Sequence, residues 1–217
     1  EQADHYRGLD AADPEPGYDC EAGLFLYDLE STWLGTWSPG RVGAFGRYPV
    51  GTGVKVEPGA VVTALIHHDL SQNGSAGRTG FRATVTDSVE REARVIPWLD
   101  IEWVGTEKMS IPANATGVTH SISDDFWGIG KEAPVLIHGA ALHMHHRGAS
   151  GSLSVERSDG SETCVISIPE WNEDWQFTHF LKEAMPFTAQ DNLHLTCTFD
   201  NIPEKQPVPG MEPQQVY

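Results

Sequence analysis

Short stretches in which apolar and polar residues alternate recur along most of this chain. The clearest is the segment 192–199, in which every second residue is apolar: Leu193, Leu195, Cys197 and Phe199. Successive side chains of a β-strand point to opposite faces, so a period of two is typical of a strand with one buried face. This segment therefore predicts a half-buried strand.

Six other segments predict strands, either from the same alternation or from their β-branched residues. They are residues 60–69, 79–86, 116–123, 135–146, 153–157 and 162–168. The first is almost wholly apolar until it reaches two histidines, which is typical of a fully buried strand. The last two flank Asp159-Gly160, and an Asp-Gly pair between two strand patterns predicts a β-hairpin.

A helical period is nearly absent from the chain. The first dozen residues are compatible with a short helix that ends before Pro14, and the segment after Asp200 is rich in proline and carries no strand pattern. Short strands separated by Gly and Pro turns predict an all-β fold of antiparallel sandwiches. A loop of small and polar residues, 71–78, predicts a domain boundary, which we place between residues 1–76 and 77–217.

The charge of the chain narrows the classes of partner. The 217 residues include 31 acidic and 14 basic side chains, a net charge of −17. Nucleic acids and anionic membrane surfaces bind to basic faces, so we expect neither as a partner. No run of 18 or more apolar residues predicts a membrane-spanning helix, and the first residues are polar and unlike a signal peptide. The sequence leaves the oligomeric state open.

The three cysteines do not form a metal-binding pattern. Cys20, Cys164 and Cys197 lack the C-x-x-C spacing of zinc ribbons, and an odd number allows at most one internal disulfide. The strongest chemical signal is instead the segment 142–148, Leu-His-Met-His-His-Arg-Gly.

On a strand, His143 and His145 of this segment would point to one face, and Met144 and His146 to the other. Two imidazoles at positions i and i+2 of a rigid strand can bind one metal ion, and imidazole suits copper, zinc, iron or nickel. The alternative is a pair of histidines on a solvated strand end with no ligand. The pattern therefore marks His143 and His145 as candidate metal ligands.

With these residues the chain resembles the type II copper, ascorbate-dependent monooxygenases, the family of peptidylglycine α-hydroxylating monooxygenase and dopamine β-monooxygenase, and in particular its bacterial branch. The segment 143–148 is similar to the H-x-H-H-x-G motif of that family. The segment 65–68, Leu-Ile-His-His, is similar to the strand that closes the family's first half. Further similar segments lie at 82–110, 118–121, 168–171 and 195–201, so the resemblance covers nearly the whole chain.

The resemblance implies two antiparallel jelly-roll domains, the first only partly present and the second without its last strands. It implies that His143 and His145 are two of three ligands of an oxygen-binding copper, and that His67, rather than its neighbour His68, is a ligand of an electron-transfer copper. The implied activity is hydroxylation of a C–H bond with O2, with ascorbate as electron donor. The implied location is secreted or periplasmic.

The chain also departs from the family. The family has an adjacent His-His pair upstream and a Glu-Met-Cys motif downstream; here only His5 precedes His67, and Met211 has different neighbours. We therefore predict that the chain is a segment of the family's core. By the same resemblance, Cys20 and Cys197 would pair with cysteines outside this segment.

A further departure concerns the substrate. Ala141 stands where the peptide-amidating enzyme has an arginine that binds the substrate carboxylate. Without that guanidinium a peptidylglycine-type acid loses its bidentate partner, so we predict a neutral or cationic small molecule instead. Two alternatives remain: a β-sandwich that binds copper or another ligand without turnover, and a purely structural jelly-roll interaction module.

We assign supporting or surface positions to several other histidines and acidic residues. We expect Asp124, Asp125 or His138 to orient the metal-binding rings, because ligand histidines usually donate their second N–H to a neighbouring acceptor. We expect His179 and His194 to lie on the surface.

Overall fold

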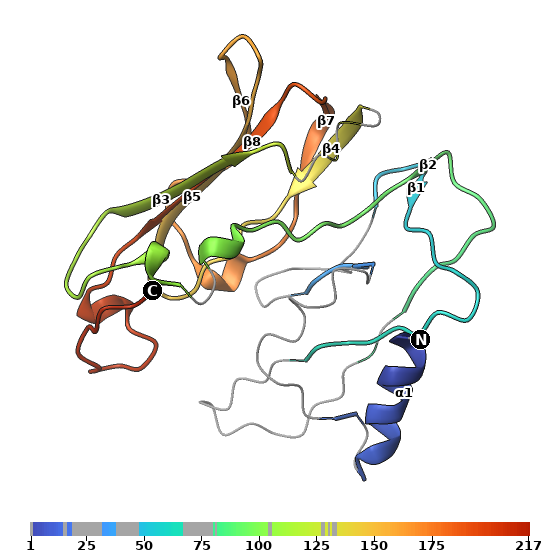
Figure 1. Ribbon diagram of the computed structural model, residues 1–217, viewed down its shortest axis with the longest axis horizontal. Coiled ribbons are helices and arrows are strands. Elements are labelled where there is room, and N and C mark those ends of the chain that lie inside the picture. Colours follow the sequence, from blue (N-terminus) through green and yellow to red (C-terminus); the bar gives the residue numbers. More distant parts are fainter. Residues whose placement is uncertain are drawn as a thin grey trace. The chain divides into compact units, whose positions relative to one another are not determined.

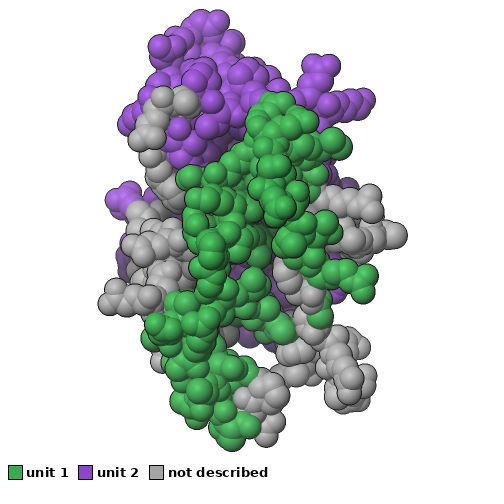
Figure 2. Space-filling view, turned by 90° about the vertical axis from the view of Figure 1, so that its right-hand side faces the viewer, with its two compact units in different colours: residues 1–34, 48–95 green, residues 35–47, 96–217 purple. Residues whose placement is uncertain are grey.

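The computed structural model describes residues 2–14, 17–18, 32–37, 48–66, 80, 82–103, 106–126, 129, 131 and 134–217. Within these residues the protein is mainly β, with one α-helix and antiparallel sheets. The chain forms two compact units: residues 1–34 with 48–95, and residues 35–47 with 96–217 (Figure 2). The predicted domain boundary between residues 76 and 77 lies outside the described residues.

In its described residues, the first unit contains the helix and one short strand pair. Helix α1 spans Gln2–Ala12 and ends before Pro14, as predicted, since the residue before a proline disfavours helical backbone. Strand β1 (Thr52–Gly53) pairs in parallel with β2 (Arg91–Glu92). An isolated antiparallel bridge joins Trp33 to Val95.

Two strand predictions for this unit are wrong in the part of the chain that the structure describes. Residues 60–66 and 82–86 form no strand there, and their apolar side chains are exposed: Leu65 by 48% and Val85 by 86%. A β-branched run favours extended backbone, but a strand also needs a partner for its N–H and C=O groups. No described segment pairs with either run.

The second unit contains two antiparallel sheets (Figure 1). The larger has the strand order β3-β8-β5-β6, and its strands are β3 (Val118–Asp124), β5 (Gly148–Glu156), β6 (Glu162–Ile168) and β8 (Asn192–Phe199). The smaller pairs β4 (Val135–Ala140) with β7 (His179–Phe187). Single 3-10 turns lie at η1 (Ile101–Trp103), η2 (Glu107–Met109), η4 (Glu173–Trp175) and η5 (Pro203–Lys205).

The alternation pattern predicted this unit well. Strand β8 has the predicted bounds, and β5 and β6 form the predicted hairpin around Asp159-Gly160. Strand β7 was missed, because Pro186 near its end interrupts the strand pattern; proline is tolerated at sheet edges, where β7 lies. Strand β4 ends at Ala140, six residues before the predicted end at His146.

The core of this unit lies on the inward face of these strands. Val155 and Phe187 are completely buried, and Leu193 and Phe199 are 4% and 5% exposed. Burial of each such side chain contributes about 1.5–3 kcal/mol. An irregularity in the β5–β6 register at Leu153/Ser154 lets two consecutive β6 residues, Val165 and Ile166, both be buried.

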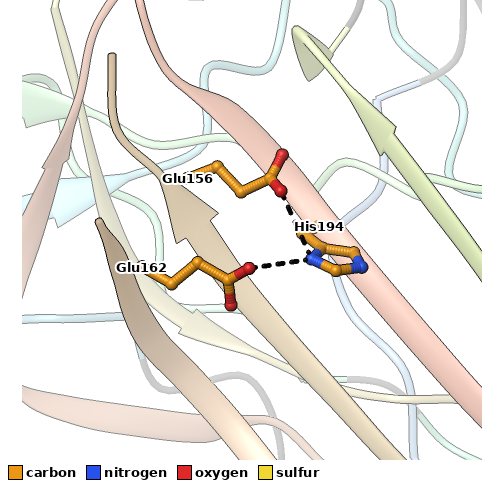
Figure 3. A group of neighbouring side chains, drawn as sticks. All are labelled: Glu156, Glu162 and His194. Atoms are coloured by element: carbon orange, nitrogen blue, oxygen red, sulfur yellow. Dashed lines mark hydrogen bonds and ion pairs between the residues drawn. The ribbon is translucent and has the colours of Figure 1, made fainter. Parts of the chain in front are cut away.

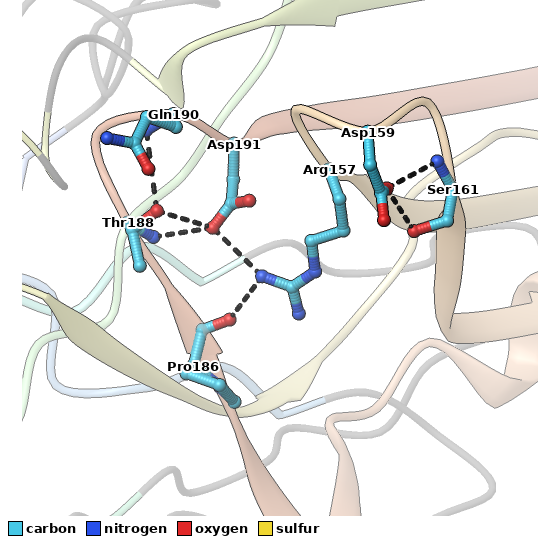
Figure 4. A network of polar contacts seen from close by, with 7 residues as sticks. All are labelled: Arg157, Asp159, Ser161, Pro186, Thr188, Gln190 and Asp191. Carbon is cyan, nitrogen blue, oxygen red and sulfur yellow. Dashed lines mark hydrogen bonds and ion pairs between the residues drawn. The ribbon is translucent and has the colours of Figure 1, made fainter.

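A partly buried ion pair joins the end of β5 to the turn between β7 and β8 (Figure 4). Arg157 Nη1 donates to Asp191 Oδ2 at 2.8 Å and to the carbonyl of Pro186 at 2.9 Å. The same carboxylate oxygen accepts from the amide and hydroxyl of Thr188 at 2.7 and 2.9 Å. Burial raises the pKa of Asp191, but the Thr188 hydrogen bonds and the guanidinium outweigh it and hold the pKa below its ordinary value.

The proline-rich segment after β8 is held by a second buried polar group. Asn201 is fully buried, and its Oδ1 accepts from Arg147 Nε at 3.0 Å and from Gln206 Nε2 at 2.9 Å. Its Nδ2 lies within 2.7–3.1 Å of three backbone carbonyls, those of Ile111, Pro112 and Gln214. This amide connects the histidine segment, through Arg147, to residues that follow the last strand.

Candidate metal site at His143 and His145

The histidine segment, residues 142–148, follows β4 beyond Ala140, the last residue of β4 that pairs with β7. Residues 141–145 belong to no strand, yet their side chains still alternate: Leu142 and Met144 are 7% and 4% exposed, whereas His143 and His145 are exposed. The buried pair lies against β5, where a Cβ at Gly151 would come within 2.9 Å of Leu142 and 3.1 Å of Met144. Core packing on one face therefore directs both imidazoles to the other face, as predicted.

The alternation ends at His145, so the prediction for His146 is wrong. Residues 146–147 form a turn in which the Gly148 amide donates to the His145 carbonyl at 2.8 Å. His146 is exposed and does not join Met144 in the core; its Nδ1 lies 2.6 Å from a carboxylate oxygen of Glu173. The turn reverses the chain into β5, which fixes the position of the two preceding imidazoles.

The structure brings His143 and His145 together through their Nε2 atoms. These nitrogens are 3.2 Å apart, and the rings meet edge to face with centroids 5.0 Å apart. Two nitrogens bound to one metal ion at about 2.0–2.1 Å in tetrahedral geometry would be about 3.3–3.4 Å apart. The spacing therefore matches that of two ligands on a single ion.

Gln176 selects the tautomer of the neutral His143 ring. The Gln176 Nε2 donates to the Glu173 carbonyl at 2.7 Å, which leaves Oε1 to face Nδ1 of His143 in a short hydrogen bond. An amide oxygen only accepts, so Nδ1 carries the proton and the lone pair of His143 lies on Nε2, toward His145. Without a metal, His145 Nε2–H can donate to this lone pair; a metal ion would replace that proton.

His145 is suited to the neutral state that metal binding requires. Partial desolvation of its ring, followed by the neighbouring His143 imidazole, lowers the pKa of His145 below its ordinary value, although the Glu173 carboxylate acts in the opposite direction. A neutral imidazole keeps the lone pair that a metal ion needs.

The donor set at this site is incomplete within the described residues. Only one group of three His, Cys, Asp or Glu donors comes within 4.8 Å of one another there, and it does not include His143 or His145. Of the four methionines of the chain, Met144 is buried in the core, Met109 and Met185 pack against the core, and Met211 is 43% exposed. Imidazole ligands suit copper. His143 and His145 would supply two of the three or four ligands of a complete site.

The other predicted site residues have different outcomes. His67 and His68 lie outside the described residues, as does Cys20. Cys164 and Cys197 are free thiols, and burial raises the pKa of Cys197 to about 11.

The residue that contacts His143 is Gln176, which the sequence did not indicate. Of the predicted residues, Asp124 accepts a hydrogen bond from the Phe126 amide at 2.6 Å, and Asp125 forms an ion pair with Lys131. A local signal for the position of Gln176 does exist: Asn172 accepts from the Asp174 amide at 2.9 Å and starts the turn η4. No local pattern, however, places this turn beside His143.

Comparison of the chain with protein-family models, with curated proteins and with solved structures finds no match. The assignment of a function therefore depends on the site itself. Among the described helices, none is both long and apolar enough to span a membrane.

Proposed function

We propose that the protein binds one copper ion through Nε2 of His143 and Nε2 of His145. The observation that carries this proposal is the 3.2 Å separation of these two nitrogens, on a segment anchored by two buried side chains. The Gln176 contact supports it, because ligand histidines are usually held by a hydrogen bond to their second nitrogen. Imidazole donors alone do not select copper over zinc or nickel; the resemblance of the H-x-H-H-x-G segment favours copper.

We further propose that the protein is part of a copper- and ascorbate-dependent monooxygenase with two jelly-roll domains. The antiparallel sheets of the second unit are compatible with that architecture. Bound copper would supply the redox chemistry with O2, and ascorbate the electrons. The chain's own residues would hold the ion on an exposed face of a rigid segment, with His67 as a ligand of a second copper.

The substrate class follows from the segment before the imidazoles. Ala141 is exposed and offers no charge to a substrate carboxylate. We therefore propose a neutral or cationic small molecule rather than a peptidylglycine acid.

Calorimetric copper titration tests the site. We expect His143→Ala and His145→Ala each to weaken binding of one copper equivalent by at least about tenfold, because each removes a direct ligand. His179→Ala is the matched control: this histidine is also exposed but stacks on Phe177, with ring centroids 4.6 Å apart. Equal affinities for the His145→Ala variant and the control would remove the basis of the proposal.

A second measurement separates the enzyme from a protein that binds copper without turnover. Ascorbate-driven O2 consumption of the copper-loaded protein should exceed that of the doubly substituted His143→Ala/His145→Ala protein. If copper binds at the two histidines but O2 consumption is the same in both proteins, the copper-binding alternative is correct and the monooxygenase proposal fails.

A further inference from the structure

A second group of metal-ligating side chains lies on the outward face of the four-stranded sheet. Glu156 ends β5, Glu162 begins β6 and His194 belongs to β8, so three neighbouring strands contribute one residue each (Figure 3). One donor atom from each residue lies within 4.8 Å of the other two. The sheet holds all three through its ladder, with Glu156 directly opposite Glu162 and Ser154 directly opposite His194.

The distances within this group fit a bound ion. His194 Nδ1 lies 3.5 Å from Oε1 of Glu156 and 3.2 Å from Oε1 of Glu162. Ligands at about 2.0–2.2 Å from a tetrahedral zinc ion are about 3.3–3.6 Å apart. The 3.5 Å distance lies within this range and the 3.2 Å distance just below it.

The outer atoms of the same three side chains are held by hydroxyl groups. Ser154 Oγ donates to Glu162 Oε2 at 3.1 Å, and Ser123 Oγ donates to Glu156 Oε2. His194 Nε2 lies 3.3 Å from the hydroxyl oxygen of Thr196. Each ligand therefore has one polar atom fixed by a neighbour while its second polar atom points to a shared centre, which is how outer hydrogen bonds orient metal ligands.

The charges at this centre favour a proton or a metal ion between the three side chains. Like charges directly opposite each other on adjacent strands are destabilising, and Glu156 and Glu162 stand in that relation. An imidazole with its proton on Nε2 would add a lone pair on Nδ1 to two carboxylate oxygens. Either a proton on Nδ1 or a metal ion is therefore favoured at the centre.

We propose that Glu156, Glu162 and His194 bind one zinc ion on the outward face of the four-stranded sheet. The set of two carboxylates and one imidazole suits zinc, whereas magnesium and calcium prefer oxygen ligands alone. Three protein ligands leave a fourth position for water or for a ligand atom from outside the protein. This site is independent of the copper proposal, since it shares no residue with it.

Zinc titration of the His143→Ala/His145→Ala protein isolates this site, because the two exposed imidazoles can no longer bind the ion. We expect one zinc equivalent to bind, and His194→Ala or Glu162→Gln to weaken binding by at least about tenfold. Glu183→Gln is the matched control, since Glu183 is also an exposed strand carboxylate but lies on β7. Magnesium at the same concentration should produce no heat of binding.

We expect the Glu162→Gln variant to fold normally, because Glu162 is exposed and its substitution leaves the core intact. A near-UV circular dichroism spectrum checks that the variant is folded. Cobalt(II) in place of zinc gives a second readout, with the visible absorption of a four-coordinate ion expected in the parent and absent in His194→Ala. If Glu162→Gln and Glu183→Gln bind zinc equally, the group is an ion pair centred on a proton and the proposal is wrong.

Discussion

Replacement of Asn201 by alanine tests the most connected buried side chain of the protein. Asn201 is fully buried, and its amide group accepts from Arg147 and Gln206 and donates to backbone carbonyls at 2.7–3.1 Å. Alanine removes these bonds and leaves the partners buried without a replacement. The turn that follows the two candidate ligands would then lose the contact of Arg147.

The expected loss of stability follows from the types of bond removed. A neutral hydrogen bond contributes about 1 kcal/mol net, and one to a charged group about 1.5–3 kcal/mol. Two N–H bonds, one amide–amide bond and one bond to the Arg147 guanidinium come to about 4.5–6 kcal/mol on this scale. Water that enters the vacated space will satisfy part of this demand, so we expect Asn201→Ala to lower the free energy of unfolding by about 3–4 kcal/mol.

Urea unfolding followed by circular dichroism measures this loss as a lower midpoint with an unchanged slope. Asn192→Ala is the matched control, because Asn192 is an exposed asparagine at the start of β8; its substitution should change stability by less than about 0.5 kcal/mol. If Asn201→Ala costs less than about 1 kcal/mol, the hydrogen bonds of this amide do not hold the segment as described.

Two further predictions concern titrating groups. Because the folded pKa of Asp191 lies below its unfolded value, its ion pair stabilises the protein above the unfolded pKa and the stabilisation is lost as the pH falls through the folded pKa. Asp191→Asn should therefore lower stability by about 2 kcal/mol at pH 7 and by much less near pH 2 in acid-titrated urea unfolding; a pH-independent difference would contradict this. Cys197 is buried with a pKa of about 11, whereas Cys164 is exposed, so a thiol reagent at pH 8 should modify Cys164 at least about tenfold faster, as peptide mass spectrometry of the labelled native protein would show. Equal rates would mean that Cys197 is not buried.

Local patterns along the sequence predicted part of this structure. Alternation placed β8 and the β5–β6 hairpin, because their side chains repeat with the period of the pleat and Asp159-Gly160 sets the turn. The same alternation placed His143 and His145 on one face, even though the segment forms no ladder. The apolar pattern of residues 60–66 predicted a buried strand, but these residues are exposed. Burial depends on partner segments, which an apolar stretch does not itself specify.

Local sequence patterns could not predict the polar clusters, because each cluster depends on which strands become neighbours in the fold. The hairpin alone sets Glu156 opposite Glu162, but His194 joins them only because β8 lies beside β5, a pairing of strands far apart in the chain. The prediction for His194 was only that it lies on the surface, because no local pattern shows the pairing of β8 with β5. Gln176 and Asn201 likewise gain their roles from tertiary contacts with His143 and Arg147.

The most direct test of the central proposal is the number of imidazoles around the first copper equivalent. X-ray absorption at the copper edge counts them through the multiple scattering of imidazole rings. With one equivalent bound, we expect two imidazole ligands in the parent protein and fewer in His145→Ala. An imidazole count that is the same in the parent and in the His143→Ala/His145→Ala protein would contradict the assignment of these two histidines.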